Sequence, residues 1–317
     1  MTYAIEAQNL RKQFGSQEVV RGVNLTVRPG ELFALLGPNG AGKTTTIHML
    51  TTLLRPDGGF ARIFGSDAVT DADEVRSLIS VTGQYAALDE SLTGSQNLML
   101  FAGLYGYTRR KSRLLAAELL EAFGLQEAGG RAVGAYSGGM RRRLDLAVGI
   151  LSRPQVLFLD EPTSGLDPQS RHEVWETIRL LVKQGTTVLL TTQYLEEADQ
   201  LADRVGFIAN GKLTAVGTPE ELKASVGGKI VTIRLKSETA AGDACRLIHA
   251  EYELNVQHEQ GSSTVKLAVQ HAAAAHEVIG TLFYNKAAVA DFMLSDPSLD
   301  DVFFALTAAA GKEGADR

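Results

Sequence analysis

The chain has 317 residues, 44% of them hydrophobic, which is enough for one large or two ordinary domains with a proper core. Its net charge of −6 gives no general attraction to nucleic acid or anionic lipid, and its one cysteine, Cys245, excludes an internal disulfide. No apolar run approaches the roughly 18 residues of a membrane span, and the first residues do not resemble a secretory signal, so we expect a soluble, cytosolic chain.

The N-terminal part reads as β-structure that leads into a phosphate-binding turn. Residues 3–7 and 19–27 are expected to be strands, with Phe14 in the turn between them. An apolar strand at 32–36 precedes the glycine-rich segment 37–45, from which a helix begins at Thr44. Strand, glycine-rich turn and helix in this order are the context in which the pattern G-x-x-x-x-G-K-[ST] binds phosphate.

The chemistry of this segment predicts a nucleoside triphosphate site. Its glycines let backbone N–H groups converge on one point, and the following helix aims its positive end at the same point. Lys43 would reach the outer phosphates, and the Thr44 hydroxyl would hold Mg²⁺. Phe14 is a candidate to stack on the adenine face, although a lone aromatic residue at a strand end is usually core packing.

The next part alternates between strand and helix and then becomes helical. A turn at 55–59, a strand at 60–64 and a helix at 71–78 lead to a strand that ends in Gln84. An amide there can touch Mg²⁺ and the attacking water, although most strand-end glutamines are simply solvated. Residues 88–131 carry apolar stripes at helical spacing, which predicts a helical insertion in the nucleotide domain.

Two later segments carry further candidates for phosphate chemistry. Ser137-Gly138-Gly139 opens a helix and offers a cap hydroxyl and free N–H groups to an anion, although such a triplet is more often a plain N-cap. The arginines at 141–143 are expected to form a solvated, ion-paired face. The apolar strand 156–159 ends in Asp160, which can hold the Mg²⁺ shell, and Glu161, which can orient or deprotonate water.

The cassette-like pattern closes near residue 220, and a second pattern follows it. A strand at 186–192 ends at Gln193, and a hairpin turns at Asn210-Gly211. After an expected linker at 223–228, the elements follow the order β-α-β-β-α-β of a ferredoxin-like unit. These are predicted at 230–235, 240–250, 254–257, 263–269, 271–284 and 288–294, closed by a helix at 299–309 and a disordered tail at 311–317.

With these motifs in this order, residues 3 to 220 resemble the ATP-binding-cassette (ABC) ATPases. The resemblance implies an α/β fold of the P-loop ABC ATPase type, with a mixed sheet core, an N-terminal antiparallel β part and a helical subdomain at about 86–150, plus a small α+β ferredoxin-like domain. It implies domains at 1–222 and 229–310. It also implies a head-to-tail homodimer in which ATP lies between the P-loop of one copy and Ser137-Gly138-Gly139 of the other.

The resemblance carries the family's site residues over to this chain. Its ATP-hydrolysing residues would be Lys43, Gln84, Glu161 and Gln193, and its Mg²⁺ ligands Thr44, Gln84 and Asp160. The ATP-binding residues would be Phe14, Val19, Gly37, Pro38, Asn39, Gly40, Ala41, Gly42, Lys43, Thr44, Thr45, Ser137, Gly138, Gly139 and Asp167.

The chain departs from the family pattern at three positions. Tyr136 and Met140 replace the leucine and glutamine that usually end the signature, and Gln193 replaces a histidine that contacts the γ-phosphate. Glutamine can donate an N–H but carries no proton or charge, so the departure bears on the hydrolysis rate. Together with the segment 191–199, these departures resemble the daunorubicin/doxorubicin-resistance ATPase subunits of drug exporters, which also carry a small C-terminal domain.

That closer resemblance implies a peripheral protein on the cytoplasmic face of the plasma membrane, paired with a separate integral-membrane permease that would contact residues 88–105. Two other functions stay open at this point: a soluble cassette ATPase acting on DNA or ribosomes, and a nucleotide-gated module that hydrolyses ATP barely. The acidic charge and the single cassette disfavour the first, and Glu161 disfavours the second. The C-terminal domain is expected to regulate the dimer or contact it, or simply to stabilise it.

Overall fold

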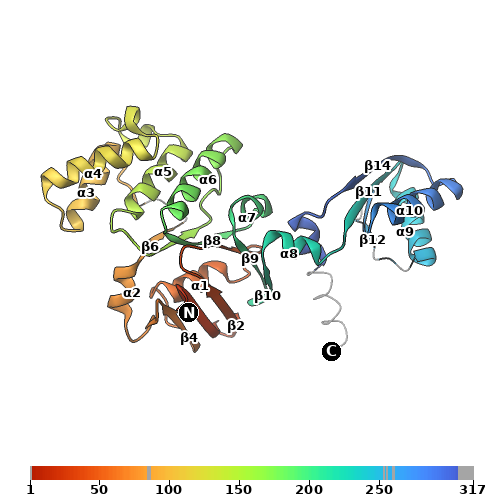
Figure 1. Ribbon diagram of the computed structural model, residues 1–317, viewed down its shortest axis with the longest axis horizontal. Coiled ribbons are helices and arrows are strands. Elements are labelled where there is room, and N and C mark those ends of the chain that lie inside the picture. Colours follow the sequence, from red (N-terminus) through yellow and green to blue (C-terminus); the bar gives the residue numbers. More distant parts are fainter. Residues whose placement is uncertain (1, 84–86, 253, 255, 259–260, 306–317) are drawn as a thin grey trace. The chain divides into compact units, whose positions relative to one another are not determined.

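The computed structural model describes residues 2–83, 87–252, 254, 256–258 and 261–305, and their contacts divide the chain into two compact units. The first unit is Met1–Thr218 and the second is Pro219–Arg317 (Figure 1). Each unit has its own strands and helices.

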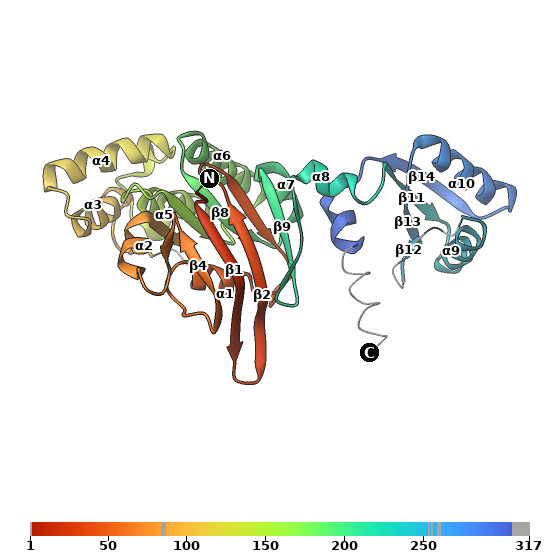
Figure 2. The same cartoon turned by 60° about the horizontal axis from the view of Figure 1, so that its bottom comes forward.

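An antiparallel sheet forms the N-terminal part of the first unit. Its strand order is β2-β1-β4-β5. Its members are β1 (Ile5–Phe14), β2 (Gln17–Val27), β4 (Gly58–Ile63) and the short β5 (Ser66–Asp67). Figure 2 shows β1 and β2 as the long paired strands of this sheet, joined by the tight turn that follows Phe14. The antiparallel β part predicted from the sequence is confirmed.

A second, mainly parallel sheet carries the ends of the strands that matter for the site. Its order is β10-β9-β3-β8-β7-β6, and only the pairing of β10 with β9 is antiparallel. The strands are β3 (Leu32–Leu36), β6 (Ile79–Thr82), β7 (Val156–Asp160), β8 (Thr187–Thr192), β9 (Arg204–Ala209) and β10 (Lys212–Gly217). Every residue of β3, β7 and β8 is buried, as expected for strands covered on both faces.

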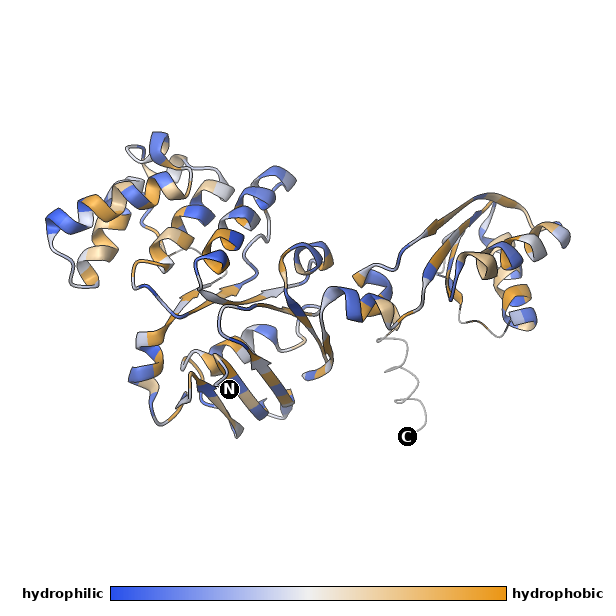
Figure 3. Cartoon of the chain, in the orientation of Figure 1, coloured by the Kyte–Doolittle hydropathy of each residue, from blue (hydrophilic) through white to orange (hydrophobic). Residues whose placement is uncertain are grey.

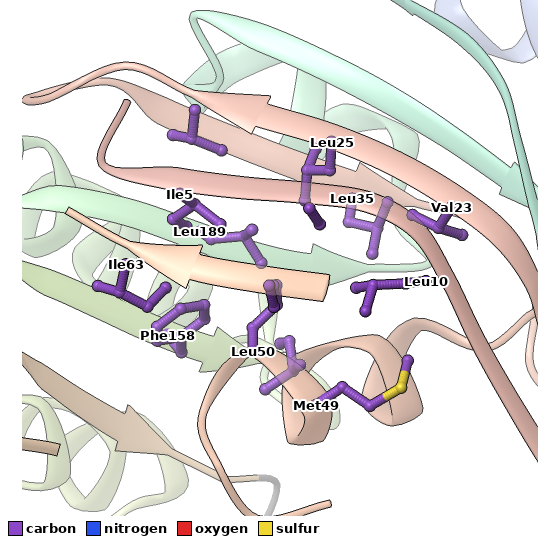
Figure 4. Close-up of a cluster of buried hydrophobic side chains, with 14 of the residues drawn as sticks. Ile5, Leu10, Val23, Leu25, Leu35, Met49, Leu50, Ile63, Phe158 and Leu189 are labelled. Atoms are coloured by element: carbon purple, nitrogen blue, oxygen red, sulfur yellow. The ribbon is translucent and has the colours of Figure 1, made fainter. Parts of the chain in front are cut away.

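Helix α1 (Lys43–Leu50) joins the two sheets into one core. Its Ile47, Met49 and Leu50 are buried against residues of both sheets, including Leu10 of β1 and Phe158 of β7. Figure 4 shows Met49 and Leu50 of α1 beside the apolar side chains of these strands. The packing fixes the start of α1, and therefore the glycine-rich loop before it, relative to the carboxyl end of β3.

The helices of the first unit follow the predicted alternation, with the helical insertion between β6 and β7. They are α2 (Ala72–Leu78), α3 (Gly94–Leu104), α4 (Arg109–Ala122), α5 (Gly138–Gly149), α6 (Pro168–Lys183) and α7 (Leu195–Leu201), with 3₁₀ turns at Gln126–Ala128 and Val133–Ala135. Helix α3 begins with a capping box in which Thr93 and Gln96 satisfy each other's backbone N–H groups.

The second unit is a four-stranded antiparallel sheet with two helices. The sheet order is β12-β13-β11-β14, which is the order expected of a ferredoxin-like β-α-β-β-α-β chain. Its elements are α8 (Pro219–Ala224), β11 (Lys229–Leu235), α9 (Glu238–Tyr252), β12 (Val256–His258), β13 (Thr264–Val269), α10 (Ala272–Tyr284) and β14 (Val289–Ser295). Residues 299–305 are helical, and the predicted remainder of that helix and the tail lie outside the described residues.

Several boundaries differ from the sequence prediction. The first strand is longer than the predicted 3–7 and ends at Phe14, which was predicted to lie in the turn. The contacts divide the chain after Thr218 rather than after residue 222, and Lys223 and Ala224, predicted as linker, belong to helix α8. The helix continues because Glu220 and Glu221 suit its positive N-terminal end and Lys223 its last turn. Among the described residues, no helix is long and apolar enough to cross a membrane. Figure 3 shows hydrophobic and hydrophilic residues mixed along the helices of both units.

Candidate nucleotide-binding site

The carboxyl ends of β3, β7 and β8 meet at one edge of the parallel sheet and border a cavity of about 500 Å³. Most of the residues that line it were predicted from the sequence to bind nucleotide or metal. The lining residues are Val19, Asn39, Gly40, Gly42, Lys43, Thr44, Thr45, Asp160, Glu161, Ser164 and Gln193. The structure therefore brings the P-loop, the two acids after β7 and the glutamine after β8 to one place.

The glycines of the loop are required by its backbone. Gly42, the N-cap of α1, has φ of 103°, and Gly40 has φ of 78°, both in the left-handed region that disfavours a Cβ. At Gly37 the constraint is space, because a Cβ there would lie 2.2 Å from the backbone oxygen of Ile208 on β9. The loop can therefore approach β9 and turn its N–H groups toward the cavity only with glycine at these positions.

Lys43 lies at the centre of the loop with its ammonium group directed at oxygen atoms. Its Nζ donates to the carbonyls of Gly37 at 2.8 Å and Pro38 at 3.1 Å, and it lies 3.6 Å from Oε1 of Glu161. Burial lowers the pKa of Lys43, and the carboxylates of Glu161 and Asp160 oppose that shift. The result is a positive charge held inside the loop, where it can meet phosphate oxygens.

Thr44 and Asp160 supply the oxygen ligands that a magnesium ion prefers. The Thr44 hydroxyl donates to Oδ2 of Asp160 at 2.9 Å, and the Thr191 hydroxyl donates to Oδ1 at 2.5 Å. One carboxylate and one hydroxyl, completed by phosphate and water, fit the way Mg²⁺ is usually bound with a nucleotide. Among the described residues, no group of three or more His, Cys, Asp or Glu side chains could hold a metal ion.

Glu161 sits at a strained turn directly after β7. Its φ of 49° lies in the left-handed region, which a non-glycine residue adopts only when its surroundings hold it there. The holding contacts come from Thr191, whose carbonyl and hydroxyl oxygens both accept from the Glu161 N–H at 3.1 Å. This backbone turn points the carboxylate toward Lys43 instead of along the strand.

A buried acid lies just beyond Gln193. Glu197 of α7 is fully buried, and its Oε1 accepts from the Thr163 hydroxyl at 2.7 Å and the Trp175 indole at 3.0 Å. Burial raises its pKa, which these hydrogen bonds oppose in part. The contacts tie the helix after Gln193 to the turn after Glu161 and to α6. Glu197 was not predicted from the sequence as a site residue; the local signal is an acid beside the apolar Ala198 of a short helix.

The second predicted anion site lies at the N-terminus of α5 and does not line this cavity. Ser137 caps α5 by accepting from the N–H of Met140 at 3.2 Å, and a Cβ on Gly139 would lie 2.7 Å from the Ser170 side chain. Asp167 caps α6, where its carboxylate accepts from the Ser170 N–H. Hydrogen bonds from the Ser170 side chain and then from its N–H lower the pKa of Asp167. The predicted residues that do not line the cavity are Phe14, Gly37, Pro38, Ala41, Ser137, Gly138, Gly139 and Asp167. Gln84 lies outside the described residues.

Tyr136, one of the departures from the signature, has a defined structural role. It is 4% exposed, and its hydroxyl donates to the carbonyl of Ala128 at 2.7 Å. The ring fits because residue 94 is glycine: a Cβ there would lie 2.3 Å from the Tyr136 hydroxyl. The aromatic residue therefore packs the start of α3 against the segment before α5.

One prediction about the arginines that follow is wrong. Arg141 is partly exposed and pairs with Glu90, as expected of a solvated face, but Arg142 is only 7% exposed. It lies beside Asp145, also buried, instead of facing solvent. Helix α5 packs on β6 at this point, so a side chain on that face of the helix is covered.

Ser164 lines the cavity and was not predicted from the sequence as a site residue.

The fold and the site together define an ATP-binding cassette. The sequence model described as ABC transporter matches residues 20–164, and the one described as ATP-binding protein DrrA1-3-like, C-terminal domain, matches residues 217–307. A solved structure of the ATP-binding subunit of an ABC transporter is similar with a TM-score of 0.62 and 29% identity, over 70% of this chain and 92% of that one. A dimeric post-hydrolysis cassette bound to ADP and Pi shares the fold, with a TM-score of 0.61 and 24% identity over 68% of this chain and 98% of that one.

Proteins of similar sequence identify the family within this class. The chain is 48% identical over 306 residues to the daunorubicin/doxorubicin resistance ATP-binding protein DrrA of Streptomyces peucetius, covering 96% of this chain and 93% of that protein. It is 44% identical over 309 residues to the doxorubicin resistance ATP-binding protein DrrA of Mycobacterium tuberculosis, with coverage of 96% and 93%. The chain belongs to the DrrA-like family of ABC ATP-binding proteins.

Proposed function

We propose that this chain hydrolyses ATP to power the efflux of drug-like or hydrophobic compounds through a separate integral-membrane permease. The names of its relatives, which refer to drug resistance, support the exporter. The observation that carries hydrolysis is the position of Glu161, held by a strained backbone turn with its carboxylate 3.6 Å from the P-loop ammonium of Lys43.

Each residue around the cavity has a separate role in the transfer of a phosphoryl group to water. Lys43 and the N–H groups of the loop neutralise the charge of the phosphates, and Thr44 and Asp160 hold Mg²⁺. The ion, when bound, withdraws charge from the phosphate oxygens. Glu161 orients the attacking water and accepts its proton, and the amide of Gln193 donates a hydrogen bond toward the outer phosphate.

We infer that two copies act head to tail. Ser137, Gly138 and Gly139 form a helix N-terminus suited to phosphate, yet they do not line the cavity of their own chain. A second copy can bring this N-terminus to the nucleotide, and the similar cassette bound to ADP and Pi is dimeric. An isologous pair of this kind would contain two equal sites.

The permease contact is assigned to helix α3. Leu100 and Leu104 of α3 and Tyr105, the residue that follows it, are 47%, 75% and 51% exposed, which places three large apolar side chains in solvent. They fall in the segment that the family resemblance connects with coupling. A permease that covered them would place the chain on the cytoplasmic face of the plasma membrane.

The test is steady-state ATP hydrolysis by the purified chain, alone and with membranes that contain a candidate integral-membrane permease. We expect turnover that the permease stimulates and that a drug-like compound raises further. Glu161→Gln should retain ATP and form an ATP-dependent dimer without turnover, whereas Glu176→Gln, a matched change at an exposed acid of α6, should turn over normally. Turnover indifferent to every membrane partner would contradict the exporter, and normal turnover by Glu161→Gln would contradict the assigned base.

A further inference from the structure

A buried ion pair in α5 touches three parts of the cassette at once. Arg142 and Asp145 are 7% and 6% exposed, and Nη1 of Arg142 donates to Oδ2 of Asp145 at 3.3 Å. The same Nη1 donates to the carbonyl of Gly83 at 2.7 Å, and Nη2 donates to the carbonyl of Asp160 at 3.4 Å. Oδ1 of Asp145 accepts from the N–H of Ala87 at 3.4 Å.

The backbone groups that the pair contacts are those next to the proposed chemistry. Gly83 follows β6 and Ala87 comes four positions later in the sequence, so the pair holds a backbone group on each side of Gln84, the predicted metal-contacting amide. The third contact is the carbonyl of Asp160, whose side chain accepts from Thr44. Helix α5 itself begins at the proposed anion site of Ser137.

A pair of this kind is a poor device for stability alone. Removing two charges from water costs about as much as their attraction returns, so an apolar pair of similar volume serves a core equally well. What an apolar pair cannot do is direct three backbone groups by hydrogen bonds. The fork of a guanidinium suits that task, because its donors have a fixed planar geometry.

We propose that Arg142 and Asp145 are positioning residues for ATP hydrolysis, which fix the backbone on both sides of Gln84 and the end of β7 to the helix of the signature. The inference rests on the proposed function. Under this proposal, the Arg142 side chain connects two parts of the site. It joins α5, which would meet the nucleotide of the other copy, to Asp160, which would hold the magnesium ion of its own copy. A shift of α5 on dimer closure is then transmitted to Gly83 and Asp160 directly.

The experiment compares four full-length variants: Arg142→Met, Asp145→Leu, the double variant, and Arg143→Met as the matched control. Arg143 lies on the same helix and also combines an ion pair, with Glu173 at 2.9 Å, and a bond to a carbonyl, that of Phe123 at 3.1 Å, but it touches neither Gly83 nor Asp160. Thermal unfolding, ATP affinity and kcat are measured for each.

Each single variant of the pair should lose kcat by about 10- to 100-fold, as expected for a lost bond to a charged group, and should unfold at a lower temperature because one buried charge is left unpaired. The double variant should regain most of the unfolding temperature but none of the turnover. ATP affinity should stay within about threefold of the parent in all variants, and Arg143→Met should keep its kcat within the same factor.

Recovery of both stability and turnover in the double variant would overturn the proposal, because the pair would then be merely structural. If the double variant does not fold, Arg142→Lys replaces it: an ammonium can pair with Asp145 but cannot span three acceptors, so kcat should fall with little change in unfolding temperature. Parent-like kcat in Arg142→Lys would overturn the proposal equally.

A readout that does not need turnover separates this inference from the proposed function. If the parent chain hydrolyses ATP in no condition, the proposed function is wrong. The role of Arg142 and Asp145 can then still be tested by amide hydrogen exchange of the peptide spanning residues 83–89. Arg142→Met and Asp145→Leu should speed exchange in that peptide, whereas Arg143→Met should leave it unchanged. Unchanged exchange in all three would overturn the proposal.

Discussion

Replacing Asp145 by asparagine should change how the stability of the first unit depends on pH. Burial raises the pKa of the Asp145 carboxyl from 3.8 to about 6, a shift that the Arg142 guanidinium and the Ala87 N–H reduce but do not cancel. Between these two values the folded chain binds more protons at this group than the unfolded chain does. The free energy of unfolding that Asp145 contributes is therefore present at low pH and is lost as the pH rises through about 6.

The size of the effect follows from the two pKa values. The interval from 3.8 to about 6 corresponds to about 3 kcal/mol in total, and about 2 kcal/mol of this falls between pH 4.5 and 7.5. Asparagine has nearly the same shape and does not titrate. Relative to Asp145→Asn, the parent chain should therefore lose about 2 kcal/mol across that range.

Urea unfolding followed by the fluorescence of Trp175 is the suitable assay. Trp175 is the one tryptophan of the sequence and is buried in α6, so its signal reports on the first unit of the intact chain. Asp73→Asn, which alters an almost fully exposed carboxyl, is the control and should follow the parent curve. Parallel curves for the parent and Asp145→Asn, or a parent that gains relative stability as the pH rises, would refute the reasoning, because the carboxyl would then be as well solvated as in the unfolded chain.

Three further substitutions test other parts of the site. Lys43→Ala should weaken ATP binding by about 10- to 100-fold in calorimetry, since a charged partner of the phosphates is removed, and an unchanged affinity would contradict the P-loop assignment. Gln193→His should keep or raise kcat, whereas a tenfold loss in the ATPase assay would mean that the glutamine has a tuned role. Tyr136→Phe should lower the free energy of unfolding by about 1 kcal/mol through the lost bond to Ala128, and no change in urea unfolding would show that water replaces it.

The nucleotide site was predictable to the extent that its signals are local. The glycine-rich loop lies between a continuous apolar run and a helical pattern, and Asp160 and Glu161 directly follow another apolar run. The carboxyl ends of parallel strands lie at one edge of a sheet, so the sequence alone predicts that these segments lie close together. The ferredoxin-like unit was predictable for a similar reason, because its alternating elements are short and follow one another closely.

The contacts that sequence reasoning missed join residues that are distant along the chain. Three consecutive arginines at 141–143 differ only by about 100° steps around a helix, and nothing local says which one faces the core. The partners of Arg142 decide it, and they lie 59 and 18 positions away, at Gly83 and Asp160. Glu197 likewise depends on Thr163 and Trp175, which are 34 and 22 positions away.

The contact between Tyr136 and residue 94 has a consequence for how sequences of this kind can diverge. The hydroxyl occupies the space that a Cβ at residue 94 would need, since the two would lie 2.3 Å apart. A leucine at position 136 lacks that hydroxyl, so the clash applies only while the tyrosine is present. A side chain added at residue 94 is therefore expected to require a smaller residue at position 136, so the two positions are coupled through packing.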